Sequence, residues 1–67
     1  MSLLQFFKYE HLPPHLQVIS KEFAELAATM ASILPDNPET EMAIRKLLEA
    51  KDCAVRSVLW KDENKKP

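Results

Sequence analysis

The sequence predicts an all-α fold, namely an antiparallel two-helix hairpin with a short N-terminal arm that assembles with further copies into a helical oligomer. Apolar residues recur at helical spacing over two long segments. The chain contains no glycine and 46% of its residues are hydrophobic, which favours continuous helices over disorder or a turn-rich β fold. We therefore expect one domain over residues 1–67, with an arm at 1–13, helices at 14–34 and 38–60, and a polar tail at 61–67.

The second predicted helix, residues 38–60, has the clearest periodicity. Six apolar residues fall within about 60° of one direction on a helical wheel: Ile44, Leu47, Leu48, Val55, Val58 and Leu59. Asn37 precedes a proline, so we predict Asn37 as the N-cap and Pro38 as the first helical residue. Lys51 lies inside this stripe. Either its stem packs while the ammonium reaches water, or the ammonium is held at an interface for an anion.

The first predicted helix begins after Pro13, because Pro14 suits the first helical position and holds Pro13 out of helical dihedrals. Its apolar stripe follows the i, i+3, i+4, i+7 pattern: Leu16, Ile19, Phe23, Leu26, Ala27, Met30, Ile33 and Leu34. A second face carries the small residues Ser20, Ala24, Ala28 and Ala31, which we interpret as a candidate oligomer contact. The short connection at residues 35–37 makes the two helices antiparallel neighbours.

The N-terminal arm is apolar but too short to fold alone, so it is expected to pack across the helices. Phe6 and Phe7 suit a core or an interface. Tyr9 stands just before the proline pair that opens the first helix, where a ring with a polar tip can face a pocket. The polar residues 61–67 are expected to fray.

Composition limits the function classes. A 67-residue chain needs a disulfide, a metal or self-association for useful stability. Cys53 is the only cysteine, and two histidines with one thiol do not make a structural zinc site, so self-association remains. The net charge of −1 disfavours DNA. No apolar run approaches the ~20 residues of a membrane span, and no signal peptide is recognisable, so we expect a cytosolic protein.

No residue constellation predicts catalysis, a cofactor or a metal. Two prolines separate His11 from His15, so the pair cannot share a helix face as metal ligands would. Cys53 lacks a neighbouring motif that would activate its thiol. Arg45, Glu49, Asp52 and Arg56 gather on one flank of the second helix, either as an ion-paired ridge or with Arg56 offering its guanidinium to a phosphate.

Short runs spread over residues 6–59 carry a resemblance to a known family. They are residues 7–13 (FKYEHLP), Leu16-Gln17, Ile19-Ser20, Phe23, Leu26-Ala27, Leu34-Pro35 and residues 47–56 (LLEAKDCAVR). Together they resemble the small phage-encoded helical-hairpin family that includes anti-CBASS cyclic-nucleotide sponges, and a related hairpin occurs in phage anti-Thoeris sponges.

The resemblance implies a non-enzymatic, nucleotide-binding protein that sequesters cyclic dinucleotides such as 3',3'-cGAMP, and in some members cyclic trinucleotides, in the bacterial host cytoplasm. Binding would block CBASS anti-phage immunity, so the function is immune evasion. Family members form homohexamers with ligand held between subunits. By the same resemblance Tyr9 stacks on a base, and Lys21 or Ser20 contacts phosphate. The predicted ligand-binding residues are Tyr9, His11, Ser20, Lys21, Lys51 and Arg56.

A second interpretation stays open: a plain protein–protein interaction or assembly module, in which Lys51 and Arg56 serve register and solubility. Nanomolar capture of a scarce messenger needs about −12 kcal/mol, more than one hairpin surface offers. Both interpretations therefore predict self-association.

Overall fold

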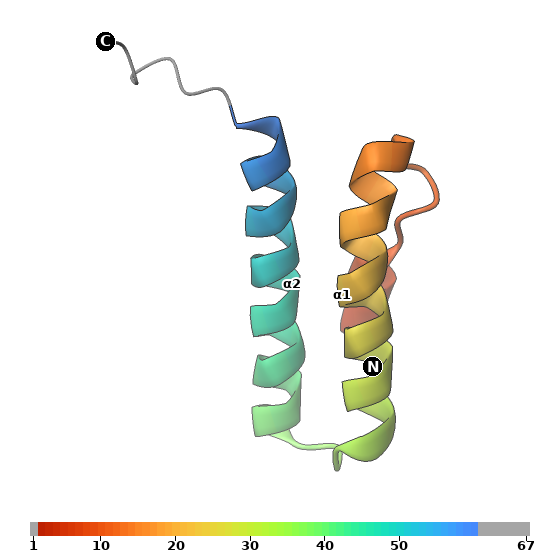
Figure 1. The fold of residues 1–67 in the computed structure, drawn as a ribbon. Helices are drawn as coiled ribbons and strands as arrows, with labels where there is room; N and C mark the ends of the chain where they lie inside the picture. The colour runs from red at the N-terminus through yellow and green to blue at the C-terminus, as the bar shows by residue number, and fades with distance from the viewer. Residues whose placement is uncertain (1, 61–67) are drawn as a thin grey trace, which may run out of the picture.

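The chain folds as the predicted antiparallel hairpin in a computed structural model that describes residues 2–60 (Figure 1). A 3-10 turn η1 (Ser2–Phe7) precedes the two helices α1 (Pro14–Ile33) and α2 (Pro38–Leu59). Each helix ends one residue earlier than predicted, because Leu34 and Trp60 have extended dihedrals and act as C-caps. The predicted polar tail, residues 61–67, lies outside the described residues.

The helix starts follow the predicted chemistry. Asn37 is the N-cap of α2, and its side chain accepts a hydrogen bond of 2.9 Å from the Thr40 N–H. The buried Thr40 hydroxyl donates to the Pro35 carbonyl and so ties the hairpin turn to the first turn of α2. In α1, Pro14 occupies the first turn and Pro13 provides no side-chain cap. Prolines and one asparagine thus define both helix starts.

The core lies where the arm folds back onto the hairpin. The arm runs antiparallel to α1, and η1 contacts both helices (Figure 1). Phe7, Ala27 and Ile44 are buried and in contact with one another, so each of the three elements contributes one residue. Eight partly buried apolar residues surround them: Leu3, Leu4, Phe23, Ala24, Met30, Ala31, Leu47 and Leu48.

The small-residue face of α1 is partly used within one chain. We expected it to contact other copies, but Ser20 is buried and Ala24 and Ala31 pack against the intrachain core, leaving Ala28 exposed. Small side chains allow close approach, and within one chain Ala24 and Ala31 pack against a core to which α2 and the arm contribute. Ser20 is therefore taken up by the intrachain packing, and a contact of this face with another copy stays a prediction.

The predicted apolar stripes are covered only in part. Five residues of the two stripes are exposed within one chain, four of them at the C-terminal end of a stripe: Leu26, Ile33, Leu34, Val58 and Leu59. Val18 and Trp60, outside the stripes, are also exposed. Two helices share a single interface, so each can bury only one narrow face against the other. The hairpin therefore presents a large apolar surface on residues that the wheel assigned to a core.

Candidate ligand-binding cleft

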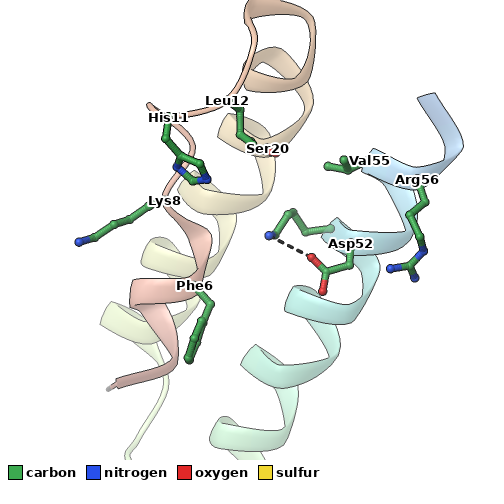
Figure 2. Close-up of a pocket in the computed structure, with 9 residues that line it drawn as sticks. Phe6, Lys8, His11, Leu12, Ser20, Asp52, Val55 and Arg56 are labelled. Carbon is green, nitrogen blue, oxygen red and sulfur yellow. Dashed lines mark ion pairs between the residues drawn. The ribbon is translucent and has the colours of Figure 1, made fainter. Parts of the chain in front are cut away.

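A cleft of about 320 Å³ opens at the end of the hairpin where α1 begins and α2 ends. Three segments line it. The arm supplies Phe6, Lys8, His11 and Leu12, α1 supplies Ser20, and α2 supplies Lys51, Asp52, Val55 and Arg56 (Figure 2).

Ser20 is the polar group buried deepest in this cleft. The residue is 1% exposed, and its Oγ has no hydrogen-bond partner in the part of the chain that the structure describes. A serine inside a helix usually donates back to a carbonyl one turn earlier. Thr29 and Ser32 do so in this same helix, at 3.0 and 2.8 Å. An unpaired buried hydroxyl is destabilising by about 1–3 kcal/mol, so a ligand that reached Ser20 Oγ and supplied a partner would remove this penalty.

Lys51 lies on the opposite wall. Its side chain is only 14% exposed, and Nζ lies 3.0 Å from Oδ1 of Asp52, whose side chain is 47% exposed. The stem is therefore packed while the ammonium reaches a carboxylate at the cleft surface, which combines elements of both interpretations of this residue. Placement at a subunit boundary stays a prediction.

Arg56 lines the cleft from an exposed position one turn further along α2. Its Nη2 donates to Sγ of Cys53 at 3.2 Å. Within residues 2–60 the predicted ridge of Arg45, Glu49, Asp52 and Arg56 does not form, because Glu49 pairs with Lys46 at 3.7 Å and Asp52 pairs with Lys51. No carboxylate holds Arg56 in the described part of the chain, so its guanidinium can turn toward an anion.

Gln17 holds the arm segment that carries His11. Its Nε2 donates to the Leu12 carbonyl at 2.7 Å and to the Glu10 carbonyl at 3.2 Å. The Leu12 N–H in turn donates to the Tyr9 carbonyl at 3.0 Å. One side chain on α1 thus fixes the turn at residues 9–12 and places two of the residues that line the cleft.

Replacing Gln17 by leucine is expected to loosen this turn while the hairpin stays folded. The leucine keeps the volume but donates no hydrogen bond, so the Leu12 amide should exchange its hydrogen roughly tenfold faster, the factor that corresponds to ~1.4 kcal/mol of lost protection. Hydrogen exchange followed by NMR measures this. Glu25→Leu, an exposed change on the same helix, should leave the rate unchanged. Equal protection in Gln17→Leu would show that the turn does not depend on Gln17.

The cleft brings together four of the six predicted ligand-binding residues: His11, Ser20, Lys51 and Arg56. The other two, the half-buried Tyr9 and the exposed Lys21, do not line it within one chain. Sequence reasoning missed Phe6, Lys8, Leu12, Asp52 and Val55 as members. Val55 was assigned to the core stripe, and Asp52 to the ridge.

Among residues 2–60, no three His, Cys, Asp or Glu side chains are grouped so that they could hold a metal ion. Neither of the described helices is long and apolar enough to span a membrane.

Comparison with protein-family models, curated proteins and solved structures finds no match to this chain. The family resemblance therefore stays a prediction.

Proposed function

We propose that this chain binds and sequesters cyclic oligonucleotide second messengers, cyclic dinucleotides such as 3',3'-cGAMP in the first place, and thereby blocks bacterial CBASS immunity. The observation that carries the proposal is the buried, unpartnered Ser20 hydroxyl in a cleft that also holds Lys51, Arg56 and an aromatic ring. A buried hydroxyl that has no hydrogen-bond partner within residues 2–60, on a residue that lines this cleft, favours a ligand that supplies the partner.

The residues that line the cleft with Ser20 could contact both the phosphate and the base of a nucleotide. Lys8, Lys51 and Arg56 can neutralise phosphate, and the imidazole of His11 can add a hydrogen bond. Phe6 is 55% exposed, so a face of its ring is open to a base. Base–aromatic stacking contributes ~1–3 kcal/mol per base. The cleft thus offers both charge neutralisation and a stacking surface.

The cleft size supports a ligand shared between copies. Small-molecule sites usually measure about 300–1,000 Å³, so about 320 Å³ holds one nucleotide unit more readily than a whole cyclic dinucleotide. In our proposal a second copy completes the site. Tyr9 and Lys21, which lie outside the cleft of their own chain, would contribute there, and the oligomer has an even number of chains, six by the family resemblance.

We propose binding rather than catalysis. Ser20, His11 and Asp52 line one cleft, which as residue types could suggest a hydrolase. However, Ser20 Oγ has no hydrogen-bond partner among residues 2–60, so none of the described residues is placed as a base to activate it as a nucleophile. Reversible capture is the chemistry that these contacts support.

Titration calorimetry with 3',3'-cGAMP tests the proposal. Wild-type protein should bind, and Lys51→Met should bind roughly 10- to 100-fold more weakly, because a charge-assisted hydrogen bond of ~1.5–3 kcal/mol is lost. Lys46→Met is the matched control, since Lys46 lies on the same helix, is exposed and pairs with Glu49. No heat of binding from the folded wild-type protein, or equal affinity in both variants, would refute the proposal for this cleft.

The alternative function, an interaction or assembly module, is favoured by a different observation. Val18, Ile33 and Trp60 are all at least 65% exposed, and assembly through the outer faces of the helices would cover such side chains. Sedimentation equilibrium with and without cyclic dinucleotide separates the two. An oligomer that forms and never takes up nucleotide supports the assembly module alone.

A further inference from the structure

The cleft contains a residue that an anion-binding site does not need. Asp52 is the one carboxylate among the described residues that line it. A carboxylate beside a phosphate is repulsive, and Asp52 shares the Lys51 ammonium with any phosphate that binds there. If the cleft served phosphate alone, an apolar or amide residue at this position would serve it better. Asp52 therefore points to a part of the ligand that donates hydrogen bonds.

The Asp52 carboxylate has hydrogen-bond acceptor sites that no group in residues 2–60 uses. Its Oδ1 lies 3.0 Å from Lys51 Nζ, and apart from this ion pair Asp52 accepts no hydrogen bond from any group in residues 2–60. An ionised carboxylate accepts on about four lone-pair sites. Lys51 therefore fixes the orientation of the carboxylate and leaves at least one oxygen edge for a ligand.

The surroundings of Asp52 suit a planar base. Figure 2 shows Phe6 on the arm and Asp52 on α2 on opposite sides of the cleft, with Val55 one turn beyond Asp52. A base whose ring plane points across the cleft toward α2 would present its edge to the Asp52 carboxylate. The Ser20 hydroxyl, on the third side, can donate to an acceptor on the same base.

Guanine is the base that matches this set. Its Watson–Crick edge presents two adjacent donors, N1–H and the N2 amino group, beside the O6 acceptor. A carboxylate can accept from both donors while a hydroxyl donates to O6 or N7. Adenine presents an unprotonated N1 at the same place, so its lone pair would face the carboxylate, and cytosine likewise presents N3. Hydrogen-bond patterns of this kind are how proteins distinguish bases.

We propose that Asp52 is a specificity-determining residue, oriented by Lys51, that makes this cleft prefer guanine over adenine in the cyclic nucleotides it binds. The inference rests on the proposed function, since it concerns the base of the same ligand.

Titration of wild-type protein with cyclic di-GMP and cyclic di-AMP tests it. Wild type should bind cyclic di-GMP about tenfold more tightly, the discrimination that good hydrogen bonds to a base edge supply. Asp52→Asn should remove this preference, because an amide both donates and accepts and pairs well with adenine. Asp52→Asn also frees Lys51 from its ion pair, which changes phosphate binding equally for both ligands. The base preference is therefore measured by the ratio of the two dissociation constants.

Glu49→Gln is the matched control. It removes one negative charge from the same helix at an exposed position that pairs with Lys46 and does not line the cleft, so the wild-type preference should persist. Equal binding of both ligands to wild type, or the same ratio in Asp52→Asn as in wild type, would overturn the inference and leave the proposed function intact. Failure of wild type to bind either ligand would instead overturn the proposed function and this inference with it.

Discussion

Replacing Ile44 by alanine is expected to lower the free energy of unfolding by about 2–5 kcal/mol, the range for truncating a buried isoleucine to alanine. Ile44 is fully buried and contacts both Phe7 of the arm and Ala27 of α1. The cavity would open where all three elements meet, and Ala27 has no side chain that could move in to fill it. Small domains are stable by only a few kcal/mol, so most of the chain should unfold.

Urea unfolding followed by far-UV circular dichroism measures this effect. Ile44→Val should be destabilising by only about 0.5–1.5 kcal/mol, because it removes a single methyl group. Arg45→Ala, an exposed neighbour, should stay within about 0.5 kcal/mol of wild type. If Ile44→Ala were no worse than Arg45→Ala, the core would have to lie elsewhere, for instance between copies.

The elements of the fold could be predicted because local chemistry determines them. Pro14, Pro35 and the Asn37-Pro38 pair punctuate the helices, and the Asn37 cap has the predicted hydrogen bond to Thr40. The partner of each face could not be predicted in the same way. A helical wheel shows that one face of α1 carries apolar side chains and another carries small ones. It does not show whether α2, the arm or a second copy covers either face.

The cleft itself was not predicted, but one of its residues could be singled out because it contradicts its local pattern. Lys51 interrupts an apolar stripe, so it called for an explanation, and the structure places it in the cleft. Asp52 gives no such signal, because neighbours in a helix project from different sides and the ion pair with Lys51 needs a particular rotamer. Lys8 and Phe6 belong to a segment whose path depends on tertiary contacts. The Ser20 hydroxyl is distinctive only by its missing partner, which sequence does not record.

Replacing Ser20 by alanine is expected to move stability and affinity in opposite directions. The free protein should be stabilised by about 1–2 kcal/mol, because the change removes a buried hydroxyl that has no partner and introduces the best helix former. Binding of 3',3'-cGAMP should weaken roughly 3- to 10-fold, because a ligand hydrogen bond of about 0.5–1.5 kcal/mol is lost. A purely structural serine would not produce this combination.

Urea unfolding gives the free energy of unfolding, and titration of the same preparation gives the affinity for 3',3'-cGAMP. Ser32→Ala provides the control on the same helix. The Ser32 hydroxyl is exposed and already donates to the Thr29 carbonyl at 2.8 Å, so its loss should change stability by no more than about 0.5 kcal/mol and leave affinity as in wild type. A destabilised Ser20→Ala variant would mean that the hydroxyl has a partner, such as a group on a second copy. A stabilised variant that keeps full affinity would mean that the ligand does not reach Ser20, and the binding site would then have to be sought away from this cleft, beginning with Tyr9 and Lys21.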